Sequence, residues 1–333
     1  MTNLKLGIIG TNFVVDWLCD AVDSTEGIVN HAVYSRTSER GNEFAAKHNI
    51  PNVYTDMEEF LSSDIDAVYI ASPNFLHGPQ AIAAMNHGKH VLVEKPAALS
   101  AAEFDEMLAC AKANNVVLIE AMRPAHDEAL ADIREAMTNI GPIRRAVLEF
   151  CQYSSRYDKF RAGEVMNAFN PALGNAAVMD IGVYALEVCV LLFGAPKEII
   201  SRSVILENGF EGMGTVFLDY GSYQVDVAYS KITDSVIPSV ITGEDGSLKL
   251  GKLSTLDSLT LCMRKQEPQV IFEGREDGGA GNMVYEVADF VKMIHGGLDQ
   301  AYYHEATRET LRIIDEVRKQ SGIIFPGCEP GKS

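Results

Sequence analysis

The stretch "LKLGIIGTNFVVDWLCDAVDS", residues 4–24, decides the fold of the N-terminal part of the chain. Its first residues form a continuous apolar strand that ends at Gly10, and residues 13–22 place apolar side chains at helical spacing. In a parallel α/β sheet, the turn from a strand into a helix N-terminus is where the pyrophosphate of a dinucleotide binds. The stretch therefore predicts the first strand–helix unit of a nucleotide-binding domain.

The same alternation continues to residue 122. Apolar strands are expected at 29–36, 66–72, 89–95 and 116–122, and helices at 38–49, 77–88 and 100–115. Short loops between continuous apolar strands and periodic helices are typical of a parallel sheet with both faces covered. We therefore expect a Rossmann dinucleotide-binding domain over residues 1–121.

The turn after the first strand keeps only part of the dinucleotide pattern G-x-G-x-x-G/A. It reads Gly10-Thr11-Asn12-Phe13-Val14-Val15, which retains the first glycine. Because Asn tolerates left-handed backbone angles, we expect Asn12 to supply the turn. Gly10, Thr11, Asn12 and Phe13 are thus candidate cofactor-binding residues, and the alternative is a purely structural strand–helix turn.

The end of the second strand indicates which nucleotide binds. NAD sites carry Asp or Glu there for the ribose 2′-hydroxyl, whereas this chain has Ser35, Arg36 and Thr37, with Arg40 one turn later. A guanidinium can bind a 2′-phosphate bidentately, and hydroxyl groups can add hydrogen bonds. The sequence favours NADP(H), with NAD(H) possible; the alternative is an ordinary basic loop with a helix cap at Ser38.

The second half has a different character. Strand-like runs occupy 144–154, 198–207, 214–220, 222–230, 239–250, 258–265 and 268–274, with hairpin turns in "DYGSY" and "GEDGS". They predict an α+β domain over residues 122–333 with a large, open, mainly antiparallel sheet. A buried helix is expected at 178–193, ending at Gly194. Asp180 and Tyr184 share one face of that helix. From the residues alone, the plainer interpretation is that Asp180 caps a neighbouring loop.

Composition limits the class of protein. The 333 residues include 28 Lys and Arg against 46 Asp and Glu, a net charge of −18, which opposes binding to nucleic acid or anionic lipid. No apolar run reaches the length of a membrane span, and the N-terminus lacks the pattern of a signal peptide. The six cysteines form no CxxC pair and the eight histidines no ligand-spaced cluster. We expect a cytoplasmic protein without a metal site.

Two motifs carry a resemblance to a known family. Ser72-Pro73-Asn74 with His77 precedes a helix, and Glu94-Lys95-Pro96 ends a strand. Taken alone, the second motif could also be a solvated strand end. A second block resembles G-G-x-x-x-D-x-G-x-H/Y at Gly174, Asn175, Asp180, Gly182 and Tyr184, with four residues in place of three before the aspartate. From about residue 4 to 325 the chain resembles the Gfo/Idh/MocA oxidoreductases, and it looks most similar to their dimeric dihydrodiol dehydrogenase and glucose–fructose oxidoreductase-like members. Asn175 departs from the second glycine of the motif.

The resemblance implies an NADP(H)-dependent dehydrogenase or reductase that acts on a CH–OH group of a small polyol, sugar-like or dihydrodiol-type substrate. It implies that Ser72, Pro73, Asn74, His77, Glu94, Lys95 and Arg123 contact the cofactor. It also implies a cis Lys95–Pro96 peptide and a homodimer formed through the C-terminal sheet.

Catalysis is expected to use Lys95, Asp180 and Tyr184. Tyr184 exchanges the proton of the substrate hydroxyl, Lys95 polarises the substrate oxygen, and Asp180 orients them. An ammonium nearby favours the phenolate and lowers the pKa of Tyr184. Because the two groups are then coupled, the roles of Lys95 and Tyr184 could be exchanged.

Two rival functions come from the same superfamily. A non-catalytic regulator that senses dinucleotide is the main alternative, but such a protein has no need of Lys95, Asp180 and Tyr184. An NAD-dependent glycosidase is disfavoured by Arg36 after the second strand and by Tyr184.

Overall fold

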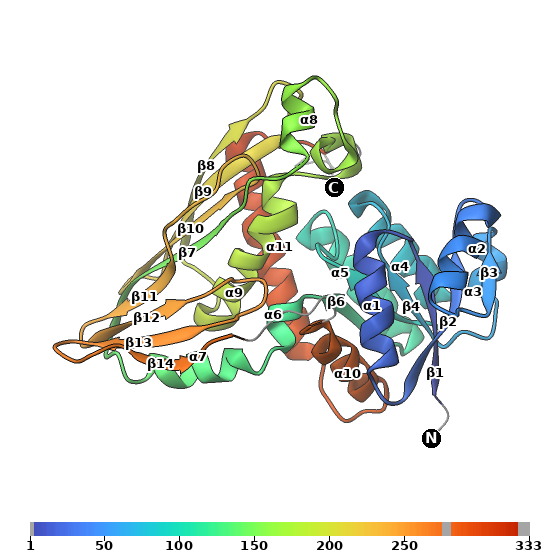
Figure 1. The fold of residues 1–333 in the computed structure, drawn as a ribbon, viewed down its shortest axis with the longest axis horizontal. Helices are drawn as coiled ribbons and strands as arrows, with labels where there is room; N and C mark the ends of the chain where they lie inside the picture. Colours follow the sequence, from blue (N-terminus) through green and yellow to red (C-terminus); the bar gives the residue numbers. More distant parts are fainter. Residues whose placement is uncertain (1–2, 275–280, 326–333) are drawn as a thin grey trace. The chain divides into compact units, whose positions relative to one another are not determined.

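The chain folds into two units. The computed structural model describes residues 3–274 and 281–325, and their contacts separate a first unit, residues 3–126 and 281–305, from a second, residues 127–274 and 306–325. The first unit extends past the expected boundary at residue 121 and takes in a late segment of the chain. That segment contains α10 (Met283–Ile294), which packs against α1 (Phe13–Asp23) and α6 (Arg123–His126) (Figure 1).

Among its described residues the first unit has one six-stranded parallel sheet in the order β3-β2-β1-β4-β5-β6. The strands are β1 (Leu4–Ile9), β2 (Ile28–Tyr34), β3 (Asn52–Tyr54), β4 (Ala67–Ile70), β5 (His90–Glu94) and β6 (Leu118–Ala121). Five of them confirm the predicted strands. The sequence analysis missed β3, because three half-buried residues are too few to show a period.

Helices cover both faces of this sheet, as alternate side chains of β1 show. Leu6 and Ile8 join the core that contains α1 and α10, whereas a Cβ on Gly7 would lie 2.7 Å from the Phe60 ring of α3 (Met57–Leu61). The remaining helices are α2 (Ser38–Lys47), the 3₁₀ turn η1 (Asn74–Leu76), α4 (His77–Asn86) and α5 (Ala101–Asn114). The strand order reverses between β1 and β4, so ligands are expected at the carboxyl ends of these strands.

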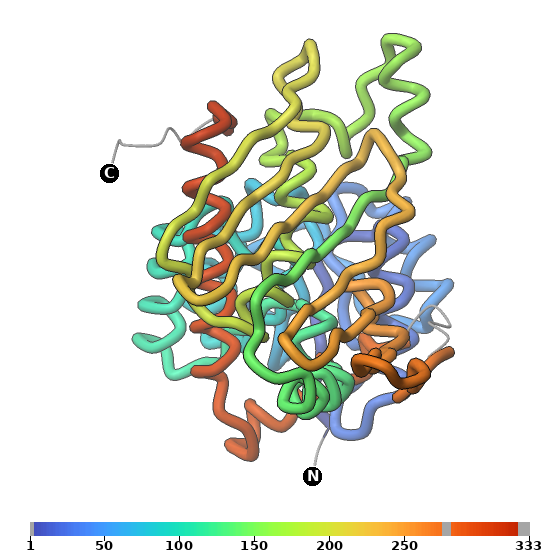
Figure 2. The backbone as a smooth tube through the Cα atoms, turned by 90° about the vertical axis from the view of Figure 1, so that its left-hand side faces the viewer, coloured from blue at the N-terminus to red at the C-terminus, as the bar shows by residue number. Residues whose placement is uncertain are grey.

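The second unit is built on an eight-stranded sheet, counted over the described residues, in the order β14-β13-β12-β11-β7-β10-β9-β8. The strands are β7 (Ile143–Cys151), β8 (Glu198–Ile205), β9 (Glu211–Asp219), β10 (Gln224–Ser230), β11 (Ser239–Gly243), β12 (Gly246–Leu250), β13 (Leu259–Met263) and β14 (Gln269–Phe272). Only β7 and β10 pair in parallel, which confirms the mainly antiparallel sheet. In Figure 2 the green tube of β7 lies among yellow and orange strands from later in the chain.

Helices of the second unit include α7 (Ala129–Met137), α8 (Tyr157–Arg161) and α9 (Val183–Phe193), and α11 (Ala301–Ser321) starts in the first unit and continues in the second. The helix expected at 178–193 is present and ends at Gly194, whose φ of 73° suits glycine. Its first turn, η4 (Val178–Gly182), is a π-helix. Over the described ranges, no helix is long and apolar enough to span a bilayer.

Candidate active site

The carboxyl ends of the first sheet bring together residues from distant parts of the chain. Gly10 follows β1, Ser35 follows β2, Ser72 lies just beyond β4, Lys95 follows β5 and Arg123 lies just beyond β6. Each belongs to a motif that the sequence analysis assigned to cofactor binding. The topology therefore gathers these motifs at one edge of one sheet, on either side of the point where the strand order reverses.

The turn after β1 differs from the expected one. Asn12 has an extended backbone, with φ −90° and ψ 173°, and the left-handed residue is Gly10, with φ 118°. A Cβ on Gly10 would lie 2.7 Å from the carbonyl oxygen of Ala71, so only glycine fits. Asn12 instead caps α1: its Oδ1 accepts from the Val14 N–H at 3.0 Å, and its Nδ2 donates to the Ala71 carbonyl at 3.0 Å.

Aromatic side chains flank this turn. Phe13 begins α1 with 53% of its surface exposed and meets the Trp17 ring edge-on at 5.3 Å. The Arg123 guanidinium lies 6.0 Å from the centre of the Trp17 ring. Phe75, in the Ser72–His77 loop, is 38% exposed. Exposed rings beside a helix N-terminus provide flat apolar surface against which a planar ring of a ligand can pack.

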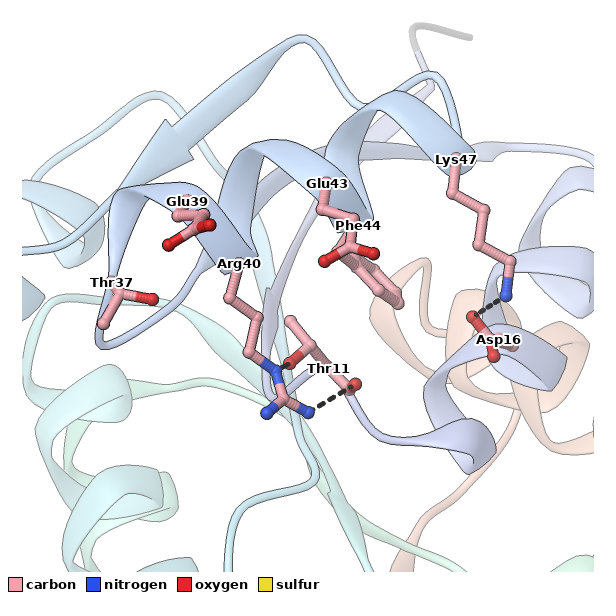
Figure 3. A pocket seen from close by; sticks show the side chains of 8 residues that line it. All are labelled: Thr11, Asp16, Thr37, Glu39, Arg40, Glu43, Phe44 and Lys47. Carbon is pink, nitrogen blue, oxygen red and sulfur yellow. Dashed lines mark hydrogen bonds and ion pairs between the residues drawn. The ribbon is translucent and has the colours of Figure 1, made fainter.

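A polar cavity of about 510 Å³ lies beside the turn (Figure 3). The Arg40 side chain crosses it and donates through Nε to the Thr11 hydroxyl at 2.6 Å and through a terminal nitrogen to the Thr11 carbonyl at 3.3 Å. Thr37 lies at its rim and makes no capping bond to α2. The other lining residues are Asp16, Glu39, Glu43, Phe44 and Lys47.

The two remaining residues of the predicted phosphate group lie differently. Arg36 is exposed and makes no hydrogen bond or ion pair with the part of the chain that the structure describes. Ser35 is buried, and a Cβ on Gly41 would lie 3.2 Å from its own Cβ. Ser35 is not among the residues that line the cavity, because the first turn of α2 packs over it.

His77 joins the two family motifs of the first unit. Its Nδ1 lies 2.8 Å from the Pro96 carbonyl oxygen and its Nε2 lies 2.9 Å from the Ser72 carbonyl oxygen. The ring is buried, and burial lowers its pKa. The Lys95–Pro96 peptide is cis, as the resemblance implied. His77 therefore holds the turn that carries Lys95 against the loop after β4.

Three carboxyl groups, one half-buried and two buried, lie near this end of the sheet. Glu94 accepts from the Tyr69 hydroxyl; burial raises the pKa of Glu94, and the charge of Lys95 opposes that rise. Glu120 on β6 accepts the Ala97 N–H at 2.7 Å and so holds the turn from the other side. Glu286 on α10 is fully buried, and neither of its oxygens has a hydrogen-bond partner among the described residues. Burial, together with Glu94, raises its pKa well above the usual value, although the charge of Arg123 opposes that rise.

Glu120 and Glu286 were not predicted as site residues from the sequence. The available signal was a charged residue at an apolar position, in the strand "VVLIEAM" and on the apolar face of the helix "MVYEVADFV".

Asp180 and Tyr184 lie in the second unit. Asp180 is in the π-helical turn, and its Oδ2 is 2.6 Å from the Nζ of Lys231, which follows β10. Tyr184 is half-buried, one turn later, with its ring 5.7 Å from that of Phe150 on β7. A π-helical turn inside an α-helix is frequent at functional sites. Lys231 was not predicted as a site residue, although it follows an apolar strand directly, as Lys95 does.

Glu211 on β9 anchors this turn. Glu211 is fully buried. Its carboxylate accepts hydrogen bonds from the Val178 N–H and from the hydroxyl groups of Ser203 and Tyr229, each at 2.8 Å. Burial raises its pKa. A Cβ on Gly182 would lie 2.9 Å from the Tyr229 ring, so this glycine allows the helix to approach β10 closely.

Comparisons with known proteins agree with this architecture. The model of an oxidoreductase family with an NAD-binding Rossmann fold, GFO_IDH_MocA, matches residues 4–122. The chain is 41% identical over 331 residues to scyllo-inositol 2-dehydrogenase (NADP(+)) IolU of Bacillus subtilis (strain 168), covering 97% of this chain and 98% of the relative. It is 27% identical over 336 residues to the trans-1,2-dihydrobenzene-1,2-diol dehydrogenase of Mus musculus, covering 97% and 98%.

A solved structure supports the fold along the whole chain. KijD10, a 3-ketoreductase from Actinomadura kijaniata in complex with NADP and TDP-benzene, superimposes with a TM-score of 0.85 over 96% of this chain and 98% of its own. Its sequence is 19% identical, so this likeness concerns the fold alone.

Proposed function

The chain belongs to the Gfo/Idh/MocA family of oxidoreductases, and from this premise we propose that it transfers hydride between NADP(H) and a CH–OH or carbonyl carbon of a small polyol, sugar-like or dihydrodiol-type substrate. As a member of this family, it is an NAD(P)-dependent dehydrogenase or reductase acting on CH–OH groups. Polyols are favoured because the inositol dehydrogenase relative is more similar, at 41% identity, than the dihydrodiol dehydrogenase, at 27%.

The observation that carries this proposal is the placement of Lys95. It follows β5 at the carboxyl edge of the sheet, on a turn that His77 and Glu120 hold from two sides. A buried strand end is a costly place for an ammonium unless the charge is used or paired. A cation fixed at this edge lies where a Rossmann sheet binds its ligand, and it can stabilise an oxygen on which negative charge develops.

The residues at the carboxyl edge fit a dinucleotide. The positive end of the dipole of α1, an 11-residue helix, suits a pyrophosphate, and the cavity beside Thr11 adjoins the turn before this helix. The preference for NADP(H) is supported by Arg36 just after β2, where an NAD site would carry a carboxylate, and by Arg40 in the first turn of α2. Glu39 and Glu43 also line the cavity, so the 2′-phosphate depends on both guanidinium groups.

We assign the proton chemistry to three side chains. The nicotinamide, when bound, supplies or accepts the hydride. In the reduction direction the Tyr184 hydroxyl gives its proton to the substrate oxygen as the carbonyl becomes an alcohol. Lys95 stabilises the negative charge on that oxygen, and Asp180 holds the orientation of the donor. In the oxidation direction Tyr184 takes the proton from the substrate hydroxyl.

The test is NADPH oxidation by the purified protein with a panel of inosose-type ketones, sugars and dicarbonyl compounds. We expect turnover with at least one cyclic polyol ketone and a loss of at least about 10²-fold in kcat for Lys95→Met. Lys112→Met, an exposed lysine on α5, is the matched control and should retain activity. If NADPH binds but no compound in the panel is reduced, the proposed substrate class is wrong.

We also propose a homodimer formed through the sheet of the second unit. The support is a group of exposed apolar side chains on its edge strands, Ile200, Val204 and Ile205 on β8 and Val270 and Ile271 on β14. Light scattering after gel filtration gives the mass directly. A monomer at micromolar concentration would exclude a stable dimer.

A further inference from the structure

Lys231 is a buried cation that the proposed reaction does not yet explain. Its side chain is 5% exposed, and its Nζ lies 2.6 Å from Asp180 Oδ2 and donates to the Ala168 carbonyl oxygen at 3.0 Å. The same nitrogen lies 5.0 Å from the ring centre of Phe169 and 5.5 Å from that of Phe210. The ammonium is therefore held by one carboxylate, one carbonyl and two aromatic faces.

The two ends of this contact differ in burial. The Asp180 side chain is 40% exposed, so water can solvate its carboxylate if the lysine is removed. Lys231 has no such access, so the loss of Asp180 would leave a buried ammonium without a counter-charge, which is strongly destabilising. The folded protein thus needs Asp180 to balance the buried charge of Lys231, whereas the Asp180 carboxylate needs Lys231 to hold its position.

Lys231 also links two segments. Ala168 belongs to the loop region 157–173, which contains α8 (Tyr157–Arg161) and the 3₁₀ turns η2 (Asn167–Phe169) and η3 (Pro171–Leu173). The rings of Phe160, Phe169 and Phe210 pack together in this region, with Phe169 and Phe210 at 4.7 Å. One ammonium therefore connects this aromatic cluster to the π-helical turn that carries Asp180.

We propose that Lys231 is a positioning residue that fixes the Asp180 carboxylate and ties the π-helical turn to the aromatic cluster. This role rests on the proposed function, because it acts on the reaction through Asp180. Lys231 is not itself expected to contact the substrate, since its nitrogen is enclosed by protein groups. Its removal should lower kcat and leave NADPH binding unchanged, because the cofactor residues belong to the first unit.

The stability test compares Lys231→Met with Asp180→Asn by thermal unfolding. Methionine can fill the space that the lysine occupies beside the two rings, so we expect a Tm within a few degrees of the wild type. We expect Asp180→Asn to lower the Tm by more, on the order of 5 °C. The reverse order would overturn the assignment of Lys231 as the dependent partner.

The kinetic test uses Lys231→Met, Asp180→Asn, the double variant and the control Lys197→Met, an exposed lysine before β8. We expect Lys231→Met to lower kcat about tenfold, with the Kd of NADPH within twofold of the wild type. The double variant should be no slower than Asp180→Asn, because both substitutions break the same Lys231–Asp180 ion pair.

Equal turnover in the wild type and Lys231→Met would refute the positioning role, as would losses that multiply in the double variant. An inactive wild type would instead contradict the proposed function, which separates the two failures.

Discussion

At the scale of single residues, we expect the choice between NADPH and NADH to depend on Arg36. Its guanidinium is exposed and makes no bond to other described residues, so it can bind a phosphate without breaking an existing contact. We predict that Arg36→Ala weakens NADPH binding at least tenfold, about 1.4 kcal/mol, and leaves NADH binding nearly unchanged. Fluorescence titration with both nucleotides measures this. Equal losses for both would remove Arg36 from the phosphate site.

Tyr184 is the residue assigned to proton exchange. Tyr184→Phe removes one hydroxyl and keeps the ring against Phe150, so the fold should be retained. We predict a loss of at least about 10²-fold in kcat, the usual contribution of a positioned acid–base group. Steady-state kinetics with a substrate from the panel tests this, and turnover at the wild-type rate would assign the proton to another group.

The buried carboxyl group of Glu286 makes the free energy of unfolding depend on pH. Burial raises its pKa well above the usual value, so the folded protein keeps this proton to a higher pH than the unfolded chain does. Between the two pKa values unfolding releases a proton, and stability falls as the pH rises above the ordinary range of a glutamate.

We predict that Glu286→Gln removes this dependence. Relative to the wild type, the variant should gain thermal stability between pH 5 and pH 8, on the order of several degrees. Glu305→Gln, an exposed glutamate of the same unit, is the control and should follow the wild type. Parallel Tm curves for the wild type and Glu286→Gln would show that Glu286 does not hold its proton.

At the scale of elements, the start of α1 has a structural role and, in the proposed function, a binding role. Asn12 caps the helix and also bonds the Ala71 carbonyl, which lies just beyond β4. Asp56 caps α3 in the same way, through the Glu59 N–H at 2.9 Å, but it follows β3, the edge strand of the sheet, and not β1. The two caps therefore form a matched pair, in which only Asn12 belongs to the proposed nucleotide turn.

We predict that Asn12→Ala and Asp56→Ala each lower the free energy of unfolding by about 0.5–2 kcal/mol. Only Asn12→Ala should also weaken NADPH binding, because it frees the turn that presents the helix N-terminus. Urea unfolding and nucleotide titration separate the two effects. A similar loss of NADPH affinity in both variants would mean that the turn has no specific role.

At the scale of the whole chain, the first unit depends on a helix encoded about 160 residues after the rest of it. Phe290 and Val287 of α10 are buried in the core formed by α1 and the sheet. We predict that Phe290→Ala costs about 3–5 kcal/mol, whereas Tyr285→Ala, on the same helix but 39% exposed, costs much less. Thermal unfolding compares them, and equal effects would place α10 outside the core of the unit.

Local patterns in the sequence predicted many of the elements, although not β3, α3, α10 or α11. Five of the six strands of the first sheet, the helix ending at Gly194 and the hairpin at 239–250 follow from apolar periodicity and turn residues, which act over a few positions. The cis peptide before Pro96 and the family followed from short motifs. These features depend on near neighbours in the chain, so a single sequence contains the information.

The tertiary structure decided which residues act together. The left-handed residue of the first turn is Gly10, because the Ala71 carbonyl, 61 residues later, leaves no room for a Cβ at this position. The tertiary structure also paired Asp180 with Lys231, and it enclosed Glu286 near Glu94, Glu120 and Arg123. Each of these outcomes depends on contacts between residues far apart in the chain. Periodicity reports which side of an element is buried, but not which distant group it meets there.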